Sequence, residues 1–83
     1  MDDLIFPAHA LKAMAADSIT AEDVYHVIGD WDDMFDYPNG RTEHVGTIED
    51  GRRVTVVLES DGETVVTAWW NKRWTDAEDE TYL

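Results

Sequence analysis

The chain has 83 residues and no cysteine, and it carries nineteen Asp and Glu against six Lys and Arg, for a formal net charge of −13. This length allows one domain with a modest core, and the missing cysteine excludes disulfides and thiolate metal sites. The longest apolar run is far too short to span a bilayer, and the acidic start Met1-Asp2-Asp3 is unlike a secretory signal, so we expect a cytoplasmic protein.

The excess of carboxylates has three interpretations. A disordered chain is disfavoured, because four Trp, three Tyr, two Phe and valine-rich segments supply apolar surface for a core. A mimic of nucleic acid would bind a basic partner protein. A protein of a salt-rich cytoplasm would stay soluble through carboxylates whose mutual repulsion is screened by salt. Only two Lys and two amide side chains accompany twelve Asp, which favours the halophilic interpretation.

The first expected helix follows a short apolar run. Leu4-Ile5-Phe6 is either a leading edge strand or a docking segment, and Pro7 suits the first turn of a helix over Ala8–Ala16. Asp17-Ser18 ends this helix. Its narrow apolar stripe consists of Ala10, Leu11 and Met14.

A second short helix follows directly. Thr20 suits the N-cap position, and Asp23 is placed to complete a variant of the capping box, with Ile19 as a hydrophobic staple. Gly29 is expected to supply the left-handed residue at the C-terminus. The apolar side consists of Val24, Val27 and Ile28.

Residues 30–40 are predicted to form an irregular, acidic and aromatic segment that ends in a Pro-Asn-Gly turn. Four aspartates here suggest a metal site, but an EF-hand loop counted from Asp30 reaches Arg41 where a bidentate Glu is needed. The three histidines have no zinc-site spacing. A solvated acidic loop is therefore the better interpretation, and we expect neither a metal nor a cofactor.

Two Asp-Gly pairs between β-branched runs predict two hairpins and a three-stranded antiparallel meander, which begins at Arg41–Glu49. Two-residue turns at Asp50-Gly51 and Asp61-Gly62 would place Val54 beside Thr47 and Trp69. The helices would then cover a face made of Val45, Val54, Val56, Leu58, Val65 and Trp69. The other face would be partly open and would carry His44, Ile48, Arg53, Thr55, Val57, Val66, Ala68 and Trp70. Residues 1–74 form the expected domain, and residues 75–83 form an acidic tail.

The sequence offers three groups of side chains with chemical potential. His9 lies in the first helical turn, where the dipole favours a neutral ring that is able to act as an acid or a base; a capping or solvated histidine is the alternative. His44 lies on the open face with Arg53, Thr55 and Trp70, and this set suits activation of a ribose 2′-hydroxyl, although ordinary sheet residues are the alternative.

The third group is basic and gathers at one end of the expected sheet, where it suits a phosphate or an acidic partner. It consists of Arg52, Arg53, Lys72 and Arg73. The alternative is internal pairing with the carboxylates of the C-terminal tail.

The order of these pieces resembles a known family. The matching motifs are His9-Ala10-x-x-x-Met14, Ile19-Thr20-x-Glu22-Asp23-Val24, Pro38-Asn39-Gly40-Arg41, Gly51-Arg52-Arg53-Val54-x-Val56-Val57 and Val65-Val66-Thr67-x-Trp69. From Ile5 to Trp70 the chain is similar to small prokaryotic domains that are grouped with the RelE-like and barnase/EndoU-like ribonuclease toxins.

The resemblance implies a β-α-α-β-β-β arrangement of helices packed on a three- to four-stranded sheet, with His9 and Thr67 as motif residues. It also implies metal-independent RNA cleavage. Ala13 stands where a basic residue is usual, and the net charge opposes RNA binding, especially at high salt.

Two functions follow as hypotheses. The first is a ribonuclease with catalytic residues His9, His44, Arg53 and Thr67 and phosphate-binding residues Arg52, Lys72 and Arg73. Its partners would be RNA or an antitoxin-like protein. The second is a catalytically silent protein-interaction module, in which aromatic side chains of residues 31–37 and 69–74 act as anchors and allow a homodimer.

Overall fold

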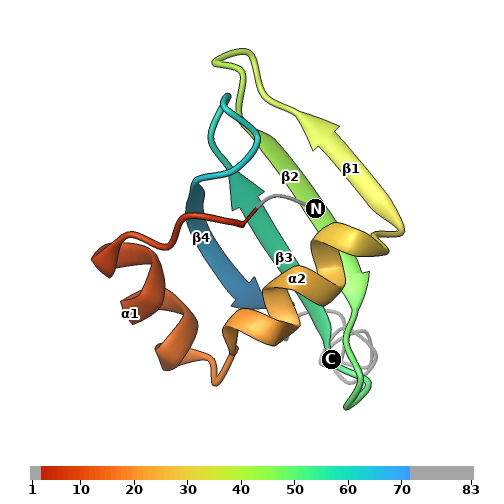
Figure 1. Cartoon of the computed structure of the whole chain (residues 1–83). Coiled ribbons are helices and arrows are strands. Elements are labelled where there is room, and N and C mark those ends of the chain that lie inside the picture. Colours follow the sequence, from red (N-terminus) through yellow and green to blue (C-terminus); the bar gives the residue numbers. More distant parts are fainter. Residues whose placement is uncertain (1–2, 72–83) are drawn as a thin grey trace, which may run out of the picture.

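The computed structural model describes residues 3–71, which form two helices followed by a four-stranded antiparallel sheet (Figure 1). The elements are α1 (Ala8–Ala16), α2 (Ala21–Gly29), β1 (Asp33–Asp36), β2 (Thr42–Thr47), β3 (Arg53–Leu58) and β4 (Val65–Trp70). The strands lie across the sheet in the order β1-β2-β3-β4, and both helices cover one face. The expected α+β class and the meander are confirmed. The predicted tail lies outside the described residues, and within them no helix is long and apolar enough to cross a membrane.

Local hydrogen bonds explain where α1 ends. The N–H of Ile19 donates to the carbonyl of Met14 at 2.9 Å, and the N–H of Ser18 donates to the carbonyl of Ala15 at 3.1 Å. With Ser18 at φ 56°, these bonds form a Schellman motif in which serine replaces the usual glycine. The predicted apolar stripe is wrong at Leu11, which is 48 % exposed.

The capping box predicted for α2 is confirmed. The N–H of Asp23 donates to Thr20 Oγ1, and the Asp23 carboxylate accepts from the N–H of Thr20. The role predicted for Gly29 is wrong, because this residue is the last helical residue and Asp30 follows it as the C-cap with φ −154°. The backbone leaves α2 without a left-handed residue.

The N–H of Ile48 donates to the carbonyl of Arg52 at 3.0 Å and extends the β2–β3 ladder by one pair, so the hairpin loop has three residues, 49–51, instead of the expected two. Its last residue, Gly51, takes φ 93°, and a left-handed residue after a tight turn is typical of three-residue hairpin loops. The register therefore pairs Val54 with Gly46, and all predicted pairs between these strands are wrong by one residue.

A β-bulge interrupts β4. Leu58 pairs with Val65, as predicted, but Val66 has no partner of its own. Beyond this extra residue the register shifts by one position, so that Val54 pairs with Trp70.

These two shifts exchange side chains between the faces of the sheet, because successive residues of a strand point to opposite sides. Val45 and Trp69, which were predicted under the helices, lie on the opposite face. The residues that move to the helix-covered face are His44, Ile48, Ala68 and Trp70.

Strand β1 corrects the prediction of an irregular segment. Its four residues pair antiparallel with β2, and all four are exposed. At the N-terminus, Ile5 forms a single parallel bridge with Thr64. The leading strand that the resemblance implies is therefore reduced to one bridge, and the fourth strand of the sheet is β1.

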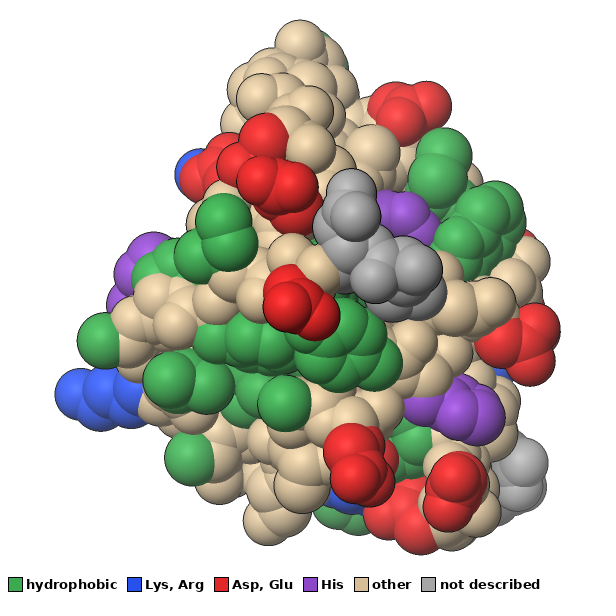
Figure 2. Space-filling view, viewed as in Figure 1, with side chains coloured by type: hydrophobic (Ala, Val, Ile, Leu, Met, Phe, Trp, Pro, Cys, Tyr) green, Lys and Arg blue, Asp and Glu red, His purple; other side chains and the backbone are tan. Residues whose placement is uncertain are grey.

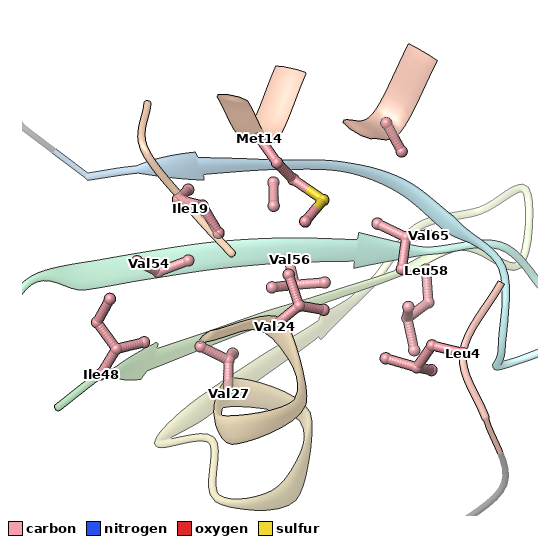
Figure 3. Close-up of a cluster of buried hydrophobic side chains, with 12 residues drawn as sticks. Leu4, Met14, Ile19, Val24, Val27, Ile48, Val54, Val56, Leu58 and Val65 are labelled. Carbon is pink, nitrogen blue, oxygen red and sulfur yellow. The ribbon is translucent and has the colours of Figure 1, made fainter. Parts of the chain in front are cut away.

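The core lies between the helices and the sheet (Figure 3). Val54, Val56 and Val65 are fully buried on the sheet side, and Val24 and Val27 are fully buried on α2. Such burial stabilises the fold by about 1.5–3 kcal/mol for each large aliphatic side chain. The remaining members of the cluster are Leu4, Ala10, Met14, Ile19, Ile48, Leu58 and Ala68.

Two glycines with the same backbone angle provide a test of how the β1–β2 loop packs against the β3–β4 loop. Gly40 and Gly51 both have φ 93°, but a Cβ on Gly40 would lie 2.9 Å from Ser60 Cβ, whereas a Cβ on Gly51 would meet nothing within 4 Å. We expect Gly40→Ala to lower the free energy of unfolding by about 1–3 kcal/mol more than Gly51→Ala. Urea denaturation of both variants measures this difference.

The double variant Gly40→Ala/Ser60→Gly serves as the control, because it removes the clashing Cβ and keeps the strained angle. It should recover most of the difference. Equal losses for the two single variants would show that the loops do not touch.

Candidate functional site

The sheet face opposite the helices, here called the open face because no described helix covers it, carries a hollow of about 350 Å³. Three side chains of this face, Val45, Thr55 and Val57, are nevertheless buried. The residues that line the hollow come from β3, from β4 and from the connection between β1 and β2, and they are Tyr37, Asn39, Arg41, Val57, Val66, Thr67 and Trp69. Val66 and Thr67 both line this open-face hollow, whereas regular alternation would turn one of two neighbours away. The bulge therefore shapes the hollow.

The charged and phenolic side chains at the hollow are already paired. Arg41 binds Glu59 through two parallel hydrogen bonds, with Nε at 3.0 Å and Nη2 at 3.1 Å from the carboxylate oxygens. The Tyr37 hydroxyl donates to Glu43, and this bond raises the pKa of the tyrosine above its ordinary value. The hollow thus offers aromatic and aliphatic walls with a neutralised guanidinium, and it holds no free cation among the residues that line it.

The hollow adjoins Trp31–Tyr37, here called the β1 segment, which is rich in exposed aromatic side chains. Within residues 3–71, seven large hydrophobic side chains are exposed, and four of them lie in this segment. Their exposed fractions are 44 % for Trp31, 39 % for Met34, 52 % for Phe35 and 39 % for Tyr37. A fifth, Trp69, lines the hollow. Large apolar side chains concentrated in this way are typical of binding surfaces.

The structure separates the predicted catalytic residues. Thr67 and Arg53 lie on the open face, and Thr67 lines the hollow. His9 is exposed on α1, which packs against the opposite face. The sheet therefore stands between His9 and these two residues.

Arg52, predicted to bind phosphate, holds α1 against the sheet. Its guanidinium donates to the carbonyls of Asp17 at 2.8 Å and Ser18 at 2.9 Å. It also binds the Asp50 carboxylate at 2.7 Å and lies 5.3 Å from the ring centre of Trp70. In return, the Asp17 carboxylate accepts from the N–H of Trp70 at 2.9 Å. His9 lies at the other end of α1, about 12 Å away along a helix that rises 1.5 Å per residue.

Carboxylates also neutralise Arg53, which binds Asp32 at 2.8 Å and Asp33 at 3.3 Å. Internal pairing was the alternative to a phosphate site, and the described arginines all bind carboxylates of residues 23–59. The tail carboxylates of that alternative lie outside the described residues. Lys72 and Arg73 lie outside the described residues. On the helix-covered face, Figure 2 shows dispersed acidic side chains and few basic ones.

His44 is buried on the helix-covered face, where its ring and the Trp31 ring form a T-shaped pair with 5.8 Å between ring centres. Burial lowers the pKa of His44, and this effect opposes a backbone hydrogen bond at Val56 and the charge of Asp36. Its Nδ1 has no hydrogen-bond partner within the described part of the chain. His44 therefore does not join Arg53 and Thr55 as a catalytic group on the open face. Across residues 3–71, no three His, Asp or Glu side chains converge as metal ligands.

The prediction from sequence missed Asn39 and Arg41 as site residues, and it named Tyr37 and Trp69 only as aromatic anchors of the interaction hypothesis. The available signal was the run Asp33-Met34-Phe35-Asp36-Tyr37 before a Pro-Asn-Gly turn, which is typical of the first strand of a hairpin. We expected this run to be part of an acidic loop and therefore did not predict the strand.

Arg52→Lys tests the structural role of this arginine. A lysine cannot hold two neighbouring carbonyls in one planar fork, so we expect the free energy of unfolding to fall by about 1–2 kcal/mol. Thermal and urea denaturation measure this change. Arg41→Lys is the matched control, since it alters an exposed pair and should cost less. Equal losses would contradict a special role for Arg52.

His44 should make stability depend on pH. Because its folded pKa lies below the ordinary value of 6.5, the unfolded chain binds the proton first, and stability is lost as the pH falls below that value. We expect His44→Gln to flatten the fall in urea midpoint between about pH 7.5 and 5.5. His26→Gln, at an exposed histidine, should leave it unchanged. The same slope in all three proteins would contradict the assignment.

Comparison of the chain with protein-family models, with curated proteins and with solved structures finds no match. The resemblance to RelE-like ribonucleases therefore stays a prediction from sequence motifs. The candidate site is defined by its geometry alone, namely the β1 segment and the open-face hollow beside it.

Proposed function

We propose that this chain is a protein-interaction module that binds a partner protein through the β1 segment and the adjoining open-face hollow. The observation that carries the proposal is the concentration of four exposed large apolar side chains within the seven residues Trp31–Tyr37. Aromatic side chains anchor protein interfaces because they bury a large area with few rotatable bonds. The halophilic composition suits this role, because salt screens acidic repulsion and leaves apolar contacts available.

The order along the sheet joins the hollow to Phe35 and Tyr37, the part of the β1 segment that lies on the open face. Tyr37 ends the β1 segment and also lines the hollow, so the two features meet at this residue. Phe35 pairs with Glu43, and both point to the open face, next to the row formed by Val57 and Thr67. A partner that covers Phe35 therefore reaches the hollow across a single strand.

RNA cleavage is supported less well by the geometry. A metal-independent ribonuclease needs an acid, a base and a cation within reach of one phosphate. Here the sheet separates His9 from Thr67, and carboxylates bind both Arg52 and Arg53. The net charge of −13 adds long-range repulsion of RNA.

The proposal is tested by comparing Phe35→Ser with Leu11→Ser. These side chains are matched in exposure, at 52 % and 48 %, but Leu11 lies on α1, away from the β1 segment. Tagged wild type and both variants are used to capture partners from extract of the source organism in molar salt. Each captured protein is then purified and titrated against the three chains by calorimetry.

We expect a purified partner to bind wild type and Leu11→Ser alike and to bind Phe35→Ser at least about tenfold more weakly, because a buried aromatic anchor is lost. Loss of binding in Leu11→Ser alone would contradict the proposal. RNA cleavage by the wild type in a metal chelator, abolished in His9→Ala, would favour the ribonuclease instead.

A further inference from the structure

The two edges of the sheet differ in how they are closed. At β4, the N–H of Val65 donates to the carbonyl of Ile5 at 2.9 Å, and the N–H of Trp70 donates to the Asp17 carboxylate at 2.9 Å. The N-terminal segment and the end of α1 thus cover both ends of that edge. At β1, all four residues are exposed, and no other strand of the described chain lies beyond it (Figure 1).

The register shows which backbone groups of β1 face outward. The N–H of Tyr37 donates to the carbonyl of Arg41, so this pair is hydrogen-bonded. In an antiparallel pair, hydrogen-bonded and non-hydrogen-bonded residues alternate, so Phe35 also faces β2. Met34 and Asp36 therefore direct their N–H and C=O groups away from the sheet, in the spacing that an added strand needs.

Apolar side chains flank this edge on both faces of the sheet. Phe35 and Tyr37 point to the open face, whereas Met34 pairs with His44 and points to the helix-covered face, where Trp31 contacts His44. In Figure 2, exposed hydrophobic side chains are visible over the β1 side of that face, at the upper right. A strand added at β1 would therefore find apolar contacts above and below its own backbone.

The negative charge near β1 favours a basic sequence in any strand that is added there. Asp30, Asp32, Asp33 and Asp36 lie within seven residues of each other, on a chain of net charge −13. A second copy paired antiparallel through β1 would bring its own four aspartates to the same edge, and the like charges of the two copies would repel each other. A strand that alternates Lys or Arg with apolar residues places opposite charges there instead.

We propose that β1 is a strand-addition site that takes an extended basic and apolar segment of a partner protein, paired antiparallel with Met34 and Asp36. This inference rests on the proposed interaction function and specifies its partner. It adds that the partner is recognised through backbone hydrogen bonds and cationic side chains, in addition to its contacts with the aromatic side chains.

The probe is an acetylated and amidated eight-residue peptide that alternates Lys and Val, titrated into the full-length ¹⁵N-labelled chain. We expect the amide chemical shifts of the β1 segment to change and hydrogen exchange at the amides of Met34 and Asp36 to become slower. Glu in place of Lys should weaken binding at least about tenfold, and added salt should weaken it progressively. A peptide with the same side chains but N-methylated at alternate residues is the matched control for backbone pairing and should not protect these amides.

Met34→Pro and Met34→Ala together separate strand addition from side-chain recognition, because both lose the Met34 side chain and Met34→Ala keeps the outward N–H. Proline removes that N–H and is tolerated at such a position of an edge strand, so the β1–β2 ladder should persist in the spectrum of the proline variant. We expect this variant to lose peptide binding. Wild-type binding that is unchanged by Met34→Pro, or absent altogether, would overturn the inference.

A natural partner would test the proposed function separately from strand addition. A natural partner that binds Met34→Pro as it binds wild type, but not Phe35→Ser, would keep the interaction module and remove strand addition. A dimer of the wild type in sedimentation, lost in Met34→Pro, would replace the basic partner with a second copy and would also overturn this inference.

Discussion

The alternation of side chains along a strand is the constraint on which the functional surface depends. Two local irregularities, the left-handed Gly51 in a three-residue loop and the extra residue Val66 in β4, each shift the register by one position. Together they bring His44 and Ala68 under the helices and turn Trp69 outward. The bulge also lets the neighbours Val66 and Thr67 line the open-face hollow together. A regular sheet with the same residues would present a different surface.

Signals confined to a few neighbouring residues predicted much of this fold. The capping box at Thr20, the extent of α1 and the pair Leu58–Val65 each follow from short-range chemistry, and the structure confirms them. The left-handed residue that ends α1 is a serine, which few sequence rules would favour at that position. The predicted face of β2 failed because an Asp-Gly pair specifies that a turn occurs and leaves its length open, and the predicted face of β4 failed because of the bulge at Val66. The length of the turn depends on packing across the sheet.

The candidate site was less predictable for the same reason. Thr67 was singled out from a motif and does line the hollow, but Tyr37, Arg41 and Trp69 reach it only through tertiary register. The predicted basic patch was assembled from residues adjacent in sequence. In the fold, Arg52 and Arg53 point to opposite faces and bind different carboxylates. Adjacent cations on a strand therefore do not form one patch, because alternation separates them.

The closure of the β4 edge has a consequence for how the chain reaches its native state. The Asp17 carboxylate and the N–H of Trp70 are 53 residues apart in sequence, and Ile5 likewise bridges to Thr64 near the start of the last strand. Neither bond can form until β4, the last described element to be synthesised, is in place. The segments that close its outer edge, the N-terminal segment and the end of α1, are synthesised first. During synthesis, the caps of α1 and α2 form from local contacts, whereas the sheet beside the β2–β3 hairpin stays incomplete until β4 is synthesised. Closure of this long loop carries an entropic cost that local contacts do not, and it sets a late, non-local step in folding.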